Sequence, residues 1–189
     1  YATLIKALAS CNLTLKDVNN TNIGFGLQNQ AVQNGAVDVA FQVEPFVSAG
    51  VQQGILDLWH PLDLAFPNQQ MNFLMYSPQF AKNQDAGLRF MVAYLAGARD
   101  YSRAISGKGD KAEMGVIMAK HLAIKDPKAY DNMIMMAVDP NGAIDLTNLN
   151  EEIKIFQDAG VVQPGAITTN WINDDFRKQA LDYLGPFTP

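Results

Sequence analysis

The stretch from Asn34 to Gly54 constrains the fold of this chain more than any other. A helix is expected to end at Asn34, a tight turn follows at Gly35, and an apolar run extends from Val37 to Val43. A short apolar run that is bounded by turn signals and rich in β-branched residues predicts a buried strand. Proline lacks a backbone donor but fits a first helical turn, so Pro45 predicts a helix that ends near Gly54.

Glu44 is the sharpest candidate for a functional residue. It stands at the carboxyl end of the predicted strand and beside a predicted helix N-terminus, where open α/β sheets bind ligands. Its carboxylate could accept hydrogen bonds from a cationic or hydroxylated ligand, or it could cap the helix that begins at Pro45. Gln42 is expected on the same face of the strand, because side chains two residues apart point the same way.

The turn from Phe25 through Gly26 to Gln28 is a second candidate site. It joins a strand predicted over 21–25 to a helix predicted over 27–34. Gly26 permits close approach of the backbone, and the helix N-terminus could hold an anion such as a sulfonate or a carboxylate. Ordinary turn chemistry is the alternative explanation of this glycine.

Two further apolar runs predict strands, over 55–60 and 71–77, and most of the chain beyond them predicts helices. Thr147 is expected to cap one of these helices. The predicted helical ranges are 85–106, 111–123, 126–136, 147–158 and 171–183.

Composition excludes several classes of protein. The 189 residues carry a net charge of −5 without a basic run, which argues against nucleic acid as a partner, and no apolar stretch is long enough to span a membrane. The single cysteine, Cys11, forbids an internal disulfide and is expected to be a small buried residue. His60 and His121 have no metal-ligand partner at helical spacing, and no motif of a nucleophilic or nucleotide-dependent enzyme is present. We therefore expect no metal, no cofactor and no catalysis.

A family pattern runs along nearly the whole chain in the segments Ala7–Val18, Gly35–Ala40 with Glu44-Pro45-Phe46, Ser77–Asn83, Asp139–Leu146 and Phe156–Val162. In the same order, these segments resemble the periplasmic substrate-binding proteins of nitrate, sulfonate and taurine importers. That family includes the binding proteins for pyrimidine precursors of thiamine. Gln42 stands where the family often has an aromatic residue, usually tryptophan.

The resemblance implies an α/β fold, a partial type II periplasmic binding protein whose two lobes have mixed sheets flanked by helices, with a helical C-terminal region. It implies that residues 1–43 belong to lobe two, 44–54 form the return crossover or hinge, and 55–189 form the later part of lobe one. Family members are usually longer, so the chain is expected to lack the N-terminal part. The surface left open is then expected to favour self-association.

The function implied is that of the solute-binding component of an ABC importer, located in the periplasm or on the outer face of the cell membrane. It would bind a small organic or inorganic anion, or a heterocyclic metabolite, between the lobes and deliver it to a membrane permease. The ligand-binding residues expected are Glu44, Gln42, Phe25, Gly26, Gln28 and Pro45.

Two alternatives belong to other classes. An enzyme similar to the thiamine-pyrimidine synthases would require a cysteine-rich motif and iron-binding histidines, and a chain with one cysteine lacks the first of these. A ligand-sensing module on the same fold is the other alternative, since a fold does not fix a function.

Overall fold

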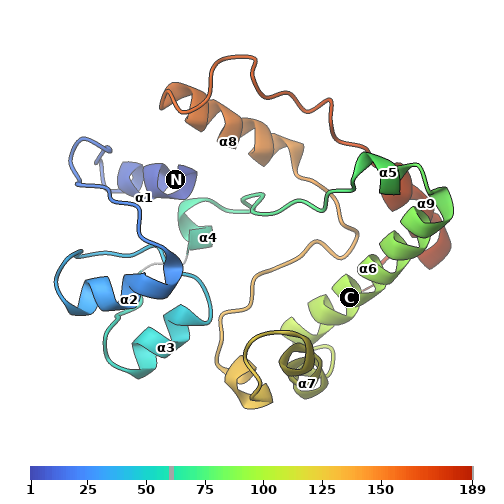
Figure 1. The fold of residues 1–189 in the computed structure, drawn as a ribbon, viewed down its shortest axis with the longest axis horizontal. Helices are drawn as coiled ribbons and strands as arrows, with labels where there is room; N and C mark the ends of the chain where they lie inside the picture. The colour runs from blue at the N-terminus through green and yellow to red at the C-terminus, as the bar shows by residue number, and fades with distance from the viewer. Residues whose placement is uncertain (60–61, 189) are drawn as a thin grey trace. The chain divides into compact units, whose positions relative to one another are not determined.

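The computed structural model describes residues 1–59 and 62–188, and in these residues helices are joined by irregular segments (Figure 1). The helices are α1 (Ala2–Ser10), α2 (Phe25–Gln33), α3 (Phe46–Gln52), α4 (Leu62–Ala65), α5 (Pro78–Ala81), α6 (Gln84–Ile105), α7 (Lys111–His121), the 3-10 helix η1 (Pro127–Asp131), α8 (Leu146–Asp158) and α9 (Asp175–Leu184).

The expectation of an α/β fold is wrong: the described residues contain no strand and no sheet. The segments 21–24, 37–43, 55–59 and 71–77 are irregular, Phe25 already belongs to α2, and His60 lies outside the described residues. An apolar run indicates only that its side chains favour burial away from water. A strand also needs a neighbouring strand to pair with its backbone N–H and C=O groups. These runs have no such neighbour, so the mixed sheets of a periplasmic binding protein are absent from the described part of the chain.

The described chain divides into two compact units. Unit 1 comprises Tyr1–Gln69, Asn132–Ile134 and Asp145–Pro164, and unit 2 comprises Gln70–Asp131, Met135–Ile144 and Gly165–Pro189. Each unit is therefore assembled from segments far apart in the sequence. The lobe boundaries at 43 and 54 stay a prediction.

Unit 1 is built on α1, which packs against α4 and α8. Ala2 and Phe66 are almost fully buried, and Leu149 of α8 joins them in the core. The ring of Tyr1 stacks on that of Phe156 with 6.1 Å between centroids. A third helix contact within this unit, between α2 and α3, brings together several of the sequence-predicted site residues.

Unit 2 is organised by α6, the longest helix, which packs mainly against α9 and also contacts α5 and α7. Leu95 of α6 and Ala180 of α9 are fully buried. Gly87 lets the two helices approach closely, because a Cβ atom there would lie 2.3 Å from Cζ of Phe176. Arg99 is also buried, with 6% of its surface exposed.

The helix predictions fared better than the strand predictions. Those over 85–106 and 111–123 are confirmed within a few residues by α6 and α7. The prediction over 126–136 is wrong apart from the short η1, and the last helix begins at Asp175 rather than near 171. Asp145, not Thr147, caps α8, because its carboxylate accepts the N–H groups of Thr147 and Asn148. Cys11 is exposed, so its expected burial is also wrong.

Candidate functional site

Glu44 acts as a helix cap in this structure. Its Oε2 accepts the backbone N–H of Ser48 at 3.0 Å, and its Oε1 accepts the Ser48 hydroxyl at 2.8 Å. The N–H of Ile134, also in unit 1, donates to Oε1 at 2.9 Å. Ser48 lies in the first turn of α3, so the carboxylate satisfies a helical N–H that would otherwise lack a partner.

Gln42 links α2 to the segment that precedes α3. Its Nε2 donates to the Phe25 carbonyl and to Oδ1 of Asn29, each at 2.9 Å, and its Oε1 accepts the N–H of Val43 at 3.0 Å. Asn29 in turn donates to the carbonyl of Phe46 at 2.8 Å. Both functional groups of the Gln42 amide are therefore engaged in holding the local fold.

The remaining predicted residues surround the N-terminus of α2 and the start of α3. Phe25 is 50% exposed, and Gly26 has open space around its Cβ position. Gln28 donates to the carbonyl of Ile23 at 2.9 Å, while its Oε1 is buried and has no hydrogen-bond partner among the described residues. Pro45 is the N-cap residue of α3. The structure thus brings Gln42 to Phe25, and the role of all six residues in ligand binding stays a prediction.

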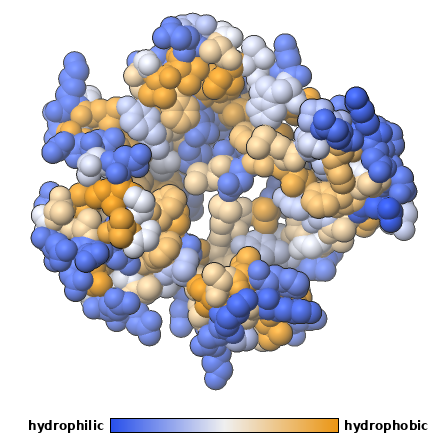
Figure 2. Space-filling view, viewed as in Figure 1, coloured by the Kyte–Doolittle hydropathy of each residue, from blue (hydrophilic) through white to orange (hydrophobic). Residues whose placement is uncertain are grey.

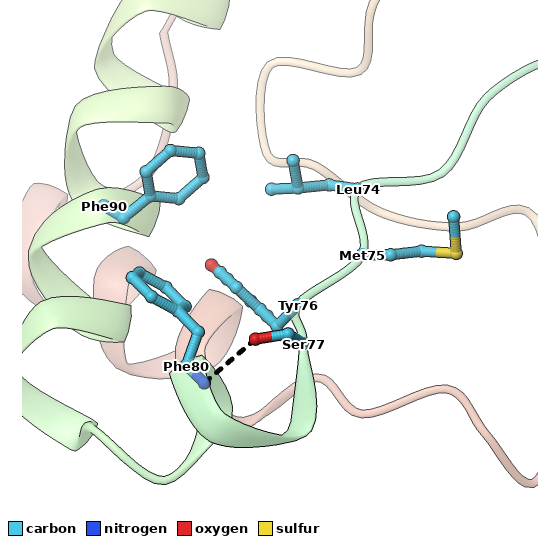
Figure 3. Close-up of a pocket in the computed structure, with 6 residues that line it drawn as sticks. All are labelled: Leu74, Met75, Tyr76, Ser77, Phe80 and Phe90. Carbon is cyan, nitrogen blue, oxygen red and sulfur yellow. Dashed lines mark hydrogen bonds between the residues drawn. The ribbon is translucent and has the colours of Figure 1, made fainter.

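A different site stands out in unit 2, and we call it the aromatic pocket (Figure 3). It is a cavity of about 350 Å³ between α5, the start of α6 and the segment that precedes α5. In Figure 3 the Tyr76 hydroxyl points toward the space between the two phenylalanine rings, and Leu74 points toward Phe90. Its six lining residues are Leu74, Met75, Tyr76, Ser77, Phe80 and Phe90.

Local capping explains how the sequence builds this pocket. The Ser77 hydroxyl accepts the N–H of Phe80 at 3.1 Å, which starts α5 at Pro78 and fixes the position of Phe80. Asn83 caps α6 by accepting the N–H of Ala86 at 3.1 Å. The two caps, six residues apart, turn the chain so that Phe80 and Phe90 face the same space.

The rings of the pocket form one aromatic cluster. Tyr76 stacks on Phe80 with centroids 5.2 Å apart, and it meets Phe90 edge-on at 5.9 Å. Phe176 of α9 supports Tyr76 from another side at 5.3 Å, also edge-on. These separations are those that aromatic pairs favour, so the cluster has a defined shape.

The Tyr76 hydroxyl is the polar feature of this cluster. It is buried, and it has no hydrogen-bond partner among the described residues. Burial raises the pKa of Tyr76 above its ordinary value of 10.0, because the phenolate would lose its hydration. The group is therefore a neutral phenol at physiological pH and can both donate and accept a hydrogen bond.

A second cavity of about 440 Å³ runs along α6 in the same unit, and we call it the α6 groove. Tyr101, one of its two tyrosines, differs from Tyr76, because the Tyr101 hydroxyl donates to the carbonyl of Met136 at 2.7 Å. Burial raises the pKa of Tyr101 as well. The lining residues are Ala93, Tyr94, Gly97, Ala98, Tyr101, Met136 and Val138.

The aromatic pocket does not follow from the sequence patterns, because 71–77 predicts a strand and Ser77–Asn83 contributes only a family motif. The signal available was the spacing of aromatic residues at Phe73, Tyr76, Phe80 and Phe90 around the Ser77-Pro78 helix start. Phe176 could not be linked to them from local sequence, since it follows Phe90 by many residues.

Other kinds of site find no support within 1–59 and 62–188. No group of three or more histidine, cysteine, aspartate or glutamate side chains there could hold a metal ion. No helix in these ranges is both long enough and apolar enough to cross a membrane. Comparison with protein-family models, curated proteins and solved structures found no match to this chain.

Proposed function

We propose that this chain binds a small solute and serves an ABC importer as its solute-binding component, in the periplasm or on the outer face of the cell membrane. The importer role is supported by the ordered resemblance of the segments named above. The aromatic pocket carries the proposal of solute binding. Its partners would be the small molecule and a membrane permease, and the role is one of binding rather than catalysis.

The pocket has the attributes of a small-molecule site. Its volume of about 350 Å³ falls in the range of known ligand pockets, which are mostly apolar and have a few polar groups that orient the ligand. Aromatic rings supply the apolar surface here, and the Tyr76 hydroxyl supplies a polar group without a partner among the described residues. Of the ligand classes expected from the sequence, a heterocyclic metabolite suits this lining best.

A binding screen tests the proposal. The purified protein is titrated with nitrate, taurine, an alkylsulfonate, benzoate and neutral heterocycles, and binding is measured by thermal shift and then by calorimetry. Phe80→Ala and Phe90→Ala are expected to weaken the binding of the solute that is found, because each removes a wall of the pocket. Val116→Ala on α7 is the control, since Val116 is 56% exposed and is not a lining residue.

Two outcomes would overturn the proposal: no solute of any class binds, or binding is indifferent to both phenylalanine changes. The importer role has its own test. Cells without the gene are expected to lose uptake of the identified solute and to regain it with the wild-type gene. If cells without the gene take up the solute as well as wild-type cells do, the chain binds the solute but does not serve an importer.

A further inference from the structure

We infer that the aromatic pocket takes a flat, uncharged aromatic molecule that carries a hydrogen-bond acceptor, and that Tyr76 selects it by donating its hydroxyl hydrogen. This inference rests on the proposed solute-binding function and names the class of ligand at the same site.

The shape of the pocket favours a planar ring. The ring centroids of Tyr76, Phe80 and Phe90 lie 5.2 to 6.2 Å apart. Tyr76 and Phe80 are stacked, and Phe90 meets each of them edge-on. A planar ligand can extend this cluster by stacking or edge contacts, each worth about 1 kcal/mol beyond the burial of area. A branched aliphatic molecule buries area but makes none of these ring contacts.

The Tyr76 hydroxyl adds selectivity for an acceptor. A buried hydroxyl without a partner loses the hydrogen bonds that it would make in water. A ring nitrogen or carbonyl placed beside it restores one of them, whereas a hydrocarbon of the same shape leaves it unpaired. Sites of this kind discriminate strongly between ligands, because the wrong ligand leaves a polar group unsatisfied.

Ligand access requires a small movement of the wall. The hydroxyl is buried in this structure, and Phe90 in the wall of the pocket has 44% of its surface exposed. Rotamer changes of exposed side chains occur in picoseconds to nanoseconds, so rotation of Phe90 can uncover the hydroxyl without disturbing the core.

The lining disfavours charged ligands. None of the six lining residues carries a positive or a negative side chain at neutral pH. An anion that entered would lose hydration without gaining a cationic partner, and this loss is large for an isolated charge.

Three matched probes test the inference: quinoline, naphthalene and naphthalene-2-sulfonate. All three have two fused aromatic rings. Quinoline carries a ring nitrogen that accepts a hydrogen bond, naphthalene has no acceptor, and naphthalene-2-sulfonate carries a negative charge. Binding is followed by NMR on protein labelled at leucine and valine methyl groups. Leu74 reports on the aromatic pocket, and Val138 reports on the α6 groove as an internal control.

Quinoline is expected to shift the Leu74 signal saturably, to leave Val138 unchanged, and to bind more tightly than either other probe. Tyr76→Phe keeps the ring but removes the hydroxyl. It is expected to weaken the affinity for quinoline about fivefold, as the loss of one hydrogen bond predicts, and to leave the affinity for naphthalene unchanged. Phe90→Leu is a second variant. Because it removes an aromatic ring from the pocket, it is expected to weaken the affinity for quinoline and for naphthalene alike.

The results that contradict the inference differ from those that contradict the proposed function. If the sulfonate binds best, or if Tyr76→Phe weakens quinoline and naphthalene equally, the inference is wrong while solute binding stands. If quinoline leaves Leu74 unshifted, the inference is wrong. The proposed function then fails as well only if no solute of the earlier screen binds, or if the binding that is found is indifferent to both Phe80→Ala and Phe90→Ala.

Discussion

The guanidinium of Arg99, in the middle of α6, donates from Nη2 to the carbonyl of Gly185 at 2.8 Å, just beyond the end of α9. The same group donates to the carbonyls of Pro140 at 3.2 Å and Leu184 at 3.4 Å, and to Oδ1 of Asn141 at 3.1 Å. One buried cation therefore holds two segments that lie far from α6 in the sequence, Pro140-Asn141 and Leu184-Gly185, against this helix.

Arg99→Ala is expected to lower the free energy of unfolding by about 3 kcal/mol, because it removes several hydrogen bonds that a buried charged group donates to partly buried oxygen atoms. Urea unfolding followed by circular dichroism measures this change. Arg89→Ala on the same helix is the control, since Arg89 forms an exposed ion pair with Asp85 and such pairs contribute little. Equal losses in the two variants would contradict the role assigned to Arg99.

Gly87→Ala and Gly97→Ala, both in α6, are expected to act in opposite directions. A Cβ atom at position 87 collides with the ring of Phe176, so Gly87→Ala should cost about 1–3 kcal/mol through overpacking. A Cβ atom at position 97 would have no atom of the described neighbouring residues within 4 Å, so Gly97→Ala should stabilise the helix by up to about 1 kcal/mol. Thermal unfolding distinguishes the two, and a shift of the same sign in both would refute the packing described for α6 and α9.

Tyr76→Phe is expected to stabilise the free protein by about 1 kcal/mol, because it removes a buried hydroxyl that lacks a partner among the described residues. Residues kept for ligand binding commonly reduce stability in this way. Tyr101→Phe is the matched change, and it should destabilise, since it deletes the hydrogen bond to Met136. Chemical denaturation of both variants without ligand measures the contrast. A loss of stability in Tyr76→Phe would show that its hydroxyl is paired.

Asp174 is expected to make part of the stability depend on pH. Hydrogen bonds from Arg177 hold the pKa of Asp174 below its usual 3.8. Because the unfolded carboxyl takes up its proton at the higher pH, the contribution is complete above about pH 4 and is lost as pH falls through the lowered native pKa. Asp174→Asn should flatten the fall in stability below that pH, as measured by urea unfolding at several pH values. An equally steep fall in stability in Asp174→Asn and in the wild type would contradict this role of Asp174.

Glu44→Ala is expected to destabilise the protein by about 1–2 kcal/mol through loss of the cap on Ser48, and to leave solute affinity unchanged. The exposed carboxylate of Asp38 in the same segment provides the control, Asp38→Ala. A large drop in affinity with little loss of stability would instead support the ligand-binding role expected from the sequence.

The sequence predicted the features that local chemistry determines. The apolar periodicity of α6 and the turn at Gly35, where φ is +69°, follow from short-range rules, and both are confirmed. The capping role of Glu44 was one of two alternatives that its position beside Pro45 left open. Its carboxylate oxygens accept hydrogen bonds from the N–H groups of Ser48 and Ile134, and the second of these bonds joins residues that no local pattern connects.

Features that depend on distant segments could not be predicted in this way. The run Val37–Val43 has a strand-like composition, but a sheet requires a partner segment that composition does not specify. The aromatic pocket likewise depends on Phe176, which reaches Tyr76 only because Gly87 brings α9 close to α6.

Because the segments of the two units alternate along the chain, the order of synthesis affects how each unit folds. Asp145–Pro164 belongs to unit 1, so the ribosome completes much of unit 2 before unit 1 has all its parts. Until then Ala2 and Phe66 lack the α8 residue Leu149 that shares their core. Such long-range closure slows folding and leaves apolar surface open during synthesis. Neither unit corresponds to a contiguous stretch of gene, so cutting the gene at any boundary between them would divide at least one of the two.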